Sequence, residues 1–177
     1  MDYDFWKKKY QSSWKESSRK EERIIQIIEK NCSCVCVKVG LGAGSQSFLS
    51  GSASSRGFKK GGSDLLIRGS NIFVEVTGPN TEKISVTQDL WLRPDKIQYA
   101  IDDPFKDCWL AHVLKKDFVV RVIHFNNRFK NDYQNNVFRL IYPFFGDSTE
   151  TMVSIPSTSY HVQGFDVLLN VIKNRVK

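Results

Sequence analysis

The stretch that decides the fold is GSDLLIRGSNIFVEVT, residues 62–77. It contains two short apolar runs, 64–67 and 72–77, whose Leu, Ile, Phe and Val residues favour β-strands. Between the runs lies RGSN, residues 68–71, in which Gly69 permits the backbone conformations of a tight turn. The stretch therefore predicts an antiparallel β-hairpin.

Two acidic residues stand on this hairpin, Asp64 at the start of the first strand and Glu75 inside the second. Because adjacent strands lie about 4.8 Å apart, two carboxylates at a similar level of a hairpin can share one cation. Oxygen ligands of this kind suit Mg²⁺ or Mn²⁺, with water and a substrate phosphate completing the coordination. Glu75 interrupts an apolar strand, and a buried carboxylate is costly unless it is paired or bound to a metal. The alternative is that Glu75 lies on the solvent face of an edge strand and needs no partner.

Charge is distributed unevenly along the chain, which carries 26 Lys and Arg residues against 19 Asp and Glu, a net charge of +7. Residues 1–60 hold 12 basic and 6 acidic side chains, residues 61–114 hold 5 and 8, and residues 115–177 hold 9 and 5. Basic outer thirds around an acidic middle suit a protein that grips a phosphate backbone and holds a metal at its centre. Ordinary surface charge is the alternative interpretation.

The length of 177 residues predicts a single domain, 1–177, with a core large enough to fold without crosslinks. Apolar residues make up 41% and charged residues 25%, as in folded globular proteins. Apolar runs are far shorter than the roughly 18 residues of a membrane span, and no apolar signal region follows the acidic N-terminus. We therefore expect neither a membrane protein nor a secreted one.

Four cysteines lie at positions 32, 34, 36 and 108. Residues 32–39, CSCVCVKV, predict a strand that places three thiols on one face as small core side chains. This spacing is unusual for structural zinc and sterically awkward for disulfides. Free thiols fit a reducing compartment, so we expect a cytoplasmic protein.

Elements around the hairpin follow from periodicity and capping signals. Residues 1–12 form a basic, aromatic lead-in to a helix that begins at Ser13 or Ser18, each opening a capping-box pattern, and ends near Asn31. Residues 40–63 hold seven of the 11 glycines and seven serines, which predicts a loop that is functional or mobile. The pattern further predicts a short strand within 84–92, strands at 108–114, 117–125, 137–144 and 151–155, and helices at 94–101 and 163–174. This order of elements indicates a mixed α/β domain.

The two strands of the hairpin together resemble the core motif of the PD-(D/E)xK nuclease superfamily. EERIIQII, residues 21–28, is similar to the first helix of the Holliday-junction resolvases of that superfamily. The predicted helix at 94–101 and strand at 108–114 fit the elements that follow the motif, so that the similarity spans residues 18–125. It implies an α/β, restriction-endonuclease-like fold in which helices flank a central mixed β-sheet.

The resemblance also implies roles for individual residues. Asp64 and Glu75 would bind the metal, joined by the backbone carbonyl of Val76, and Glu21 would be the acidic residue of the first helix. Glu22 is a rival for that last role, but Glu21 shares a helix face with the apolar residues. Alternatively, Glu21 serves only in the capping box that starts the helix.

The sequence departs from the family pattern at Thr77, where the superfamily has a catalytic lysine two positions after the glutamate. That lysine orients the attacking water and stabilises the charge that develops on the phosphate. A lysine from elsewhere could take the role; Lys96 on the following helix is the best candidate, with Lys59 and Lys60 on the loop behind it. Otherwise the metal alone generates the hydroxide, or the site has lost catalysis and retains binding.

Basic residues of the Gly/Ser loop, Arg56, Lys59 and Lys60, precede Asp64 in the chain and would contact nucleic-acid phosphates there. A solvated loop without a ligand is the alternative.

With the resemblance, the sequence predicts a divalent-metal-dependent DNA endonuclease that uses Mg²⁺ or Mn²⁺ to hydrolyse phosphodiester bonds. The substrate could be a branched junction or a short duplex sequence, and the family implies a homodimer. One alternative is a catalytically inactive nuclease fold that binds nucleic acid. Another is a protein-interaction module that has kept the fold alone.

Overall fold

A six-stranded mixed sheet forms the centre of the structure, a computed structural model that describes residues 3–40, 62–145 and 148–176. In the order of hydrogen-bonded neighbours its strands are β1 (Cys36–Lys38), β2 (Leu65–Ile67), β3 (Ile72–Thr77), β5 (Asp107–Val113), β6 (Val120–His124) and β11 (Val162–Gly164). Strands β3 and β5 run parallel, whereas the other neighbouring pairs of this sheet are antiparallel. The parallel pair requires a long crossover, and helix α3 (Pro94–Asp102) lies within it.

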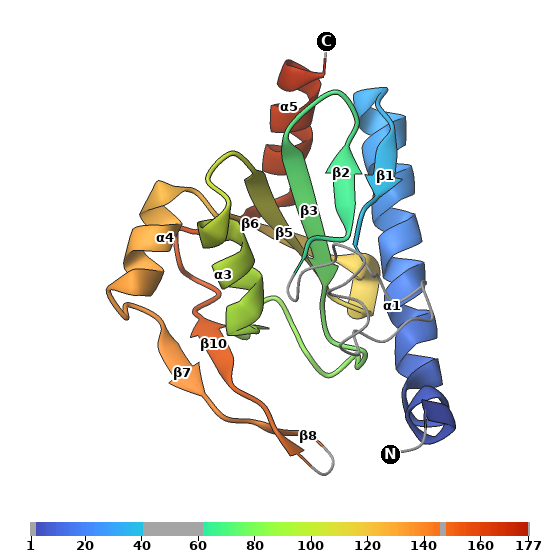
Figure 1. Cartoon of the computed structure of the whole chain (residues 1–177), viewed down its shortest axis with the longest axis vertical. Helices are drawn as coiled ribbons and strands as arrows, with labels where there is room; N and C mark the ends of the chain where they lie inside the picture. The colour runs from blue at the N-terminus through green and yellow to red at the C-terminus, as the bar shows by residue number, and fades with distance from the viewer. Residues whose placement is uncertain (1–2, 41–61, 146–147, 177) are drawn as a thin grey trace.

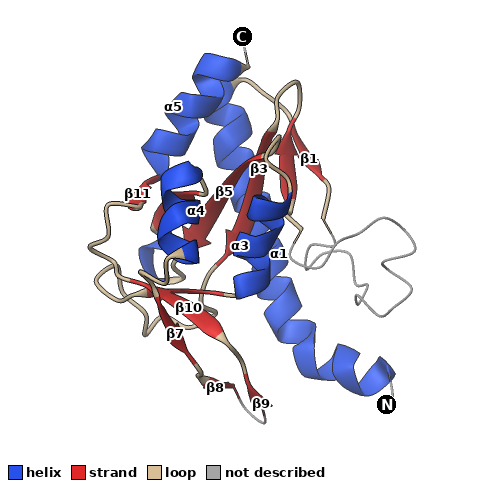
Figure 2. Ribbon diagram, turned by 60° about the vertical axis from the view of Figure 1, so that its left-hand side comes forward, coloured by secondary structure: helices blue, strands red, loops and turns tan. Residues whose placement is uncertain are grey.

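Helices cover both faces of this sheet (Figure 1, Figure 2). They are α1 (Tyr3–Cys32), α3, α4 (Asn127–Gln134) and α5 (Phe165–Arg175), and a 3-10 turn (Lys116–Phe118) joins β5 to β6. Helices α1 and α5 lie on one face, and α3 and α4 lie on the other (Figure 2). The expected fold class, an α/β fold with a central mixed sheet flanked by helices, is confirmed. None of the helices in the described ranges is long and apolar enough to cross a membrane.

Two smaller sheets complete the fold. One has the strand order β4 (Leu90–Leu92), β10 (Met152–Ile155) and β7 (Arg139–Ile141), and the other pairs β8 (Phe144–Phe145) with β9 (Ser148–Thr149). Strands β7 to β10 form an arm that projects away from the central sheet (Figure 1, Figure 2). Several of its large apolar side chains are exposed: Leu140, Tyr142, Phe144 and Phe145.

Strand alternation divides the apolar residues between two cores. On the α1 and α5 side, Val74 and Val76 of β3 pack with Ile24 and Ile28 of α1. On the other side, Phe73 of β3 packs against a cluster that holds residues of α3, α4 and the β4–β10 sheet. Because successive strand residues point to opposite faces, Glu75 lies on the α3 side of the sheet with Phe73.

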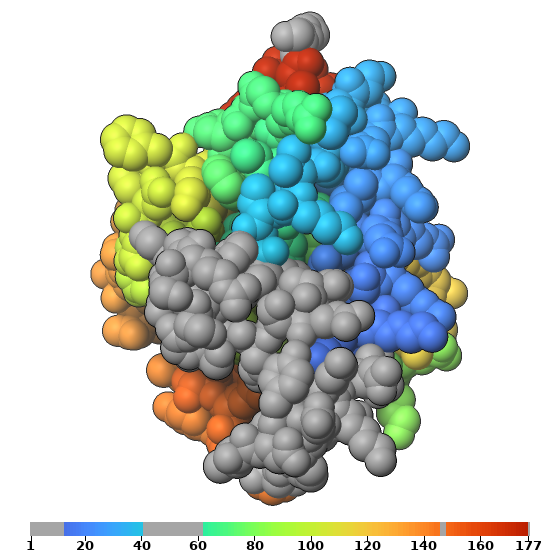
Figure 3. Space-filling model, turned by 45° about the vertical axis from the view of Figure 1, so that its right-hand side comes forward, coloured from blue at the N-terminus to red at the C-terminus, as the bar shows by residue number. Residues whose placement is uncertain are grey.

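Helix α1 differs from the sequence-based expectation of a separate lead-in at residues 1–12. It runs without interruption from Tyr3, so Ser13 and Ser18 lie inside the helix and neither begins it. No glycine or proline occurs within the helix to break it. The capping-box interpretation of Glu21 is therefore wrong. In Figure 3, α1 (blue) lies beside β1 (cyan) and the β2–β3 hairpin (green).

The cysteine strand predicted at 32–39 is largely wrong. Cys32 is the last residue of α1, and β1 is confined to Cys36–Lys38, because Ser33 has a positive φ of 51° that turns the chain out of the helix. All four cysteines are free thiols, with Cys32 and Cys108 buried.

Other predicted elements are mostly confirmed, with shifts at their ends. The hairpin has its turn at 68–71, where Gly69 adopts a φ of 79°, and α3 begins at Pro94 as predicted. The strand predicted at 137–144 is divided into β7 and β8, because Pro143 has no backbone N–H to donate. Helix α4 escaped prediction, since its sequence NRFKNDYQ buries a single residue, Phe129, and shows no apolar stripe.

Candidate active site

Asp64 closes the hairpin with its side chain. The backbone register of β2 and β3 ends at the pair Leu65 and Val74. Immediately beyond it, the Asp64 N–H donates to the Val74 carbonyl over 3.1 Å, while the Val76 N–H donates to Oδ2 of Asp64 over 2.8 Å. A carboxylate thus takes the place of a backbone acceptor, and Asp64 is held against β3 at a defined position.

The carbonyl group of Val76 points to the same side of β3 as its N–H group, the side on which Asp64 lies. In a strand, the N–H and C=O groups of one residue project to the same side, as the paired bonds of antiparallel ladders require. Because the Val76 N–H is directed at Asp64, its C=O faces the β2 side, where the register with β2 has already ended. A backbone oxygen therefore stands beside the carboxylate of Asp64.

Glu75 is buried, with 6% of its surface exposed, which excludes the solvent-facing alternative. Its Oε1 lies 2.7 Å from Nζ of Lys96, and its Oε2 is buried without a hydrogen-bond partner among the described residues. The pKa of Glu75 is raised to about 8, mainly by burial and secondly by the negative charge of Asp64. Burial also raises the pKa of Asp64, although Lys96 and the Val76 N–H oppose it.

Lys96 supplies the positive charge of the cluster. It stands in the first turn of α3, which begins at Pro94, and its side chain is 15% exposed. Nζ also lies 3.5 Å from the carbonyl oxygen of Gly62. Burial alone would lower the pKa of Lys96, but the charges of Glu75 and Asp64 outweigh it, so the pKa is raised and the ammonium form is held.

The remaining sequence-based candidates lie in different places. Thr77 is half-buried on β3, two residues after Glu75 and on the same side of the strand. Glu21 is buried in α1, which packs on the opposite face of the sheet from α3, and Glu22 is exposed. Three basic residues fall outside the described residues: Arg56, Lys59 and Lys60.

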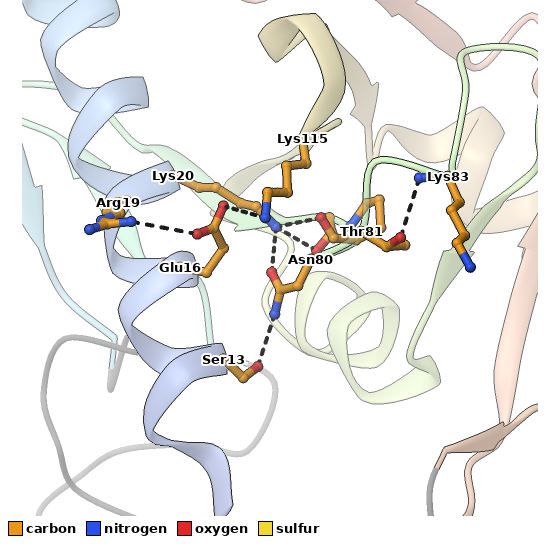
Figure 4. A network of polar contacts seen from close by, with 10 residues as sticks. Ser13, Glu16, Arg19, Lys20, Asn80, Thr81, Lys83 and Lys115 are labelled. Atoms are coloured by element: carbon orange, nitrogen blue, oxygen red, sulfur yellow. Dashed lines mark hydrogen bonds and ion pairs between the residues drawn. The ribbon is translucent and has the colours of Figure 1, made fainter.

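A second lysine, not singled out in the sequence, fixes the end of β3 (Figure 4). Lys20 of α1 is 5% exposed and its Nζ donates to the carbonyl oxygens of Gly78 and Pro79 over 2.9 and 2.8 Å and to Oδ1 of Asn80 over 2.7 Å. Burial lowers the pKa of Lys20 to about 8. Gly78 has a φ of 145°, and a Cβ there would collide with the backbone of Val113. This contact connects α1 to the turn that follows Glu75, Val76 and Thr77.

The side chains of this cluster form a donor set that can be compared with the needs of a divalent metal. Among the described residues, no group of three or more His, Cys, Asp and Glu side chains is arranged to hold an ion. Mg²⁺, however, is commonly held by one or two carboxylates, with water and substrate phosphate as its other ligands. Asp64, Glu75 and the Val76 carbonyl provide such a set. Oε2 of Glu75 is buried without a hydrogen-bond partner among the described residues and is therefore available to bind a cation. The residues fit a hard divalent cation.

Comparison with known proteins gives no family. No family model matches the chain, and no curated protein matches it either. Among solved structures, a nuclease from a fusselovirus matches with 10% sequence identity and a TM-score of 0.49. The match covers 89% of this chain and 88% of that one. An identity and a TM-score this low assign no activity, so function must be argued from the geometry of the site.

Proposed function

We propose that this protein is a divalent-metal-dependent nuclease of the PD-(D/E)xK type that hydrolyses phosphodiester bonds in DNA. The observation that carries the proposal is the buried cluster of Asp64, Glu75 and Lys96 at one end of the β2–β3 hairpin. Two carboxylates taken out of water cost several kcal/mol each unless they are compensated, so a fold that needed only stability would avoid them. Functional sites are where such groups recur.

Lys96 can replace the motif lysine that is absent at position 77, where this sequence has threonine. The ammonium that the motif normally supplies from β3 is supplied here from α3, and it lies 2.7 Å from Glu75. Threonine at position 77 therefore does not imply a site without a cation. This contact favours an active enzyme over the alternative of a nuclease fold that only binds nucleic acid.

In the proposed mechanism, Asp64, Glu75 and the Val76 carbonyl would hold Mg²⁺ or Mn²⁺. The bound metal would supply Lewis acidity, lowering the pKa of a water molecule and offsetting phosphate charge. Nζ of Lys96, which carries three donor hydrogens, keeps one bond to Glu75 and can direct another at the attacking water or a phosphate oxygen. Water attacks phosphorus as the bond to the leaving sugar oxygen breaks, the attacking water gives up a proton to solvent, and the leaving sugar oxygen takes up a proton from solvent.

We further propose a homodimer, and the arm of strands β7 to β10 as the surface where the copies meet. Tyr142 is 64% exposed and Phe144 is 69% exposed. Residues 137–155 hold three charged residues, Arg139, Asp147 and Glu150, and so carry a net charge of −1 on a chain whose net charge is +7. Two like-charged copies can approach there without strong repulsion. Sedimentation of the wild type and Phe144→Ser tests this, because a monomeric wild type would contradict it.

The free thiols favour a reducing, cytoplasmic location, also as a proposal.

Cleavage assays test the enzymatic proposal. Labelled duplex, single-stranded and four-way-junction DNA are incubated with Mg²⁺, Mn²⁺ or EDTA. Asp64→Asn and Glu75→Gln keep the shape of each side chain and remove its charge, so both are expected to abolish metal-dependent cutting while the protein stays folded. The DNA that is cut fastest identifies the substrate type. Binding of DNA without cutting by the wild type would instead support the binding-only alternative.

A further inference from the structure

Arg93 stands one helical turn from Lys96. It is the residue before Pro94, with extended backbone angles, φ −68° and ψ 137°, and its carbonyl oxygen accepts the Lys96 N–H over 3.1 Å. Arg93 is the N-cap residue of α3 and stands three positions before Lys96, the residue that contacts Glu75. Its positive charge also counts among the influences that lower the pKa values of Asp64 and Glu75.

The guanidinium of Arg93 is more accessible to a ligand than the ammonium group of Lys96. Its side chain is 48% exposed, against 15% for Lys96. Nε lies 3.5 Å from Oδ1 of Asp95, and within the described part of the chain its terminal nitrogens have no partner. Asp95, in the first turn of α3, has both carboxylate oxygens buried without a hydrogen bond there, so its contact to Arg93 and the helix N-terminus both favour its charged form.

Charge balance shows what such a group would do. Two carboxylates and one ammonium leave the buried cluster with a net charge of about −1 when all are ionised, which repels a phosphodiester. A divalent cation reverses the sign, but the phosphate gains further negative charge during hydrolysis. An exposed arginine at the edge of the cluster, with a planar fork that matches two phosphate oxygens, meets that need.

We propose that Arg93 is a catalytic residue that binds the non-bridging oxygens of the scissile phosphate, with Asp95 positioning its guanidinium. The inference rests on the proposed nuclease function and names the chain's own contact to the phosphate, beside the metal. Arginine is suited to this contact because both of its terminal nitrogens can donate at once, whereas Lys96 already gives one of its three donor hydrogens to Glu75.

Single-turnover cleavage by Arg93→Ala, Arg93→Lys and Arg68→Ala tests the proposal. Arg68 is an exposed arginine in the turn at the other end of the hairpin and controls for the loss of one positive charge. At saturating Mg²⁺, Arg93→Ala should cleave about 100-fold more slowly than wild type. Arg93→Lys should recover only part of the rate, and Arg68→Ala should resemble wild type.

Two outcomes would overturn the role of Arg93 while leaving the nuclease intact. One is Arg93→Ala at the wild-type rate. The other is full recovery by Arg93→Lys together with a shifted pH profile in Arg93→Ala, which would mean that the charge only tunes Glu75. If the wild type itself fails to cut, the nuclease proposal fails, and binding of duplex DNA with Ca²⁺ then decides on Arg93. Binding weaker in Arg93→Ala than in Arg68→Ala supports the phosphate contact, and equal binding or none rejects it.

Discussion

Nζ of Lys96 lies 2.7 Å from Oε1 of Glu75, although one residue belongs to a helix and the other to a strand of the central sheet. The contact places a positive charge beside the two buried carboxylates at the end of the β2–β3 hairpin. In the proposed nuclease site, Lys96 would supply the positive charge that Thr77 lacks. The same contact determines how the protein should respond to mutation, pH and metal.

Replacement of Lys96 by methionine should destabilise the fold by about 3–5 kcal/mol at pH 8, because it leaves a buried carboxylate pair without its cation. Lys106→Met is the matched control, since Lys106 pairs with Asp103 over 3.2 Å at a more exposed position and should cost less than about 1 kcal/mol. Urea unfolding of the three proteins measures the difference. Equal losses in both variants would contradict the proposed importance of the buried pair.

Stability should fall as pH rises from about 5 to 8. The pKa of Glu75 is about 8 in the folded protein, against an ordinary value of 4.5 for a solvated glutamate, so the folded state binds more protons between these values. The free energy of unfolding then decreases with pH, by at most about 1.4 kcal/mol per pH unit for one group. Denaturant titrations across this range should show the slope in wild type and a smaller one in Glu75→Gln. An identical slope in Glu75→Gln would mean that other groups cause the pH dependence of stability.

Mg²⁺ should stabilise the wild type, because a ligand that binds the folded state alone adds about 2.7 kcal/mol at 100 times its dissociation constant. Affinity should rise with pH toward 8, since the metal binds the ionised form of Glu75. Thermal unfolding with and without Mg²⁺ measures the effect. Asp64→Asn should lose it, and retention of the full shift in that variant would place any metal elsewhere.

Lys20→Met should lower both stability and cleavage without touching the cluster itself. The substitution removes three hydrogen bonds that connect α1 to the turn after β3, and a hydrogen bond from a charged donor is worth about 1.5–3 kcal/mol. Arg19→Met, next to it on the same helix but 66% exposed at its side chain, is the control. Cleavage at the wild-type rate by Lys20→Met would show that the turn does not position Glu75.

The sequence allowed the hairpin and its acidic pair to be predicted, because β-strand composition, a glycine turn and a charge inside an apolar run are all local signals. It also pointed to Lys96, which follows a helix-initiating proline. The bond from the Val76 N–H to Asp64 was not predictable, since it depends on where the register of two strands ends. The role of Lys20 was equally hidden, because a lysine among other charges of a helix gives no sign that tertiary contacts bury it.

The start of α1 and the path of the cysteine segment were mispredicted for a related reason. Capping patterns at Ser13 and Ser18 are permissive, and with no breaking residue before them the helix extends past both. The alternation of Cys32, Cys34 and Cys36 looks like a strand, but the packing of Ile28 and Cys32 keeps the helix intact as far as Cys32. In this segment, tertiary packing therefore outweighs the alternating pattern of the cysteines.

The central claim is that Lys96 performs the work of the motif lysine, and a rescue experiment tests it most directly. Single-turnover cleavage with Mg²⁺ is measured for wild type, Lys96→Met and the double variant Lys96→Met, Thr77→Lys. We predict that Lys96→Met loses nearly all activity and that lysine at position 77, on the same side of β3 as Glu75, restores a measurable part of it. Cleavage by Lys96→Met at the wild-type rate would contradict this claim.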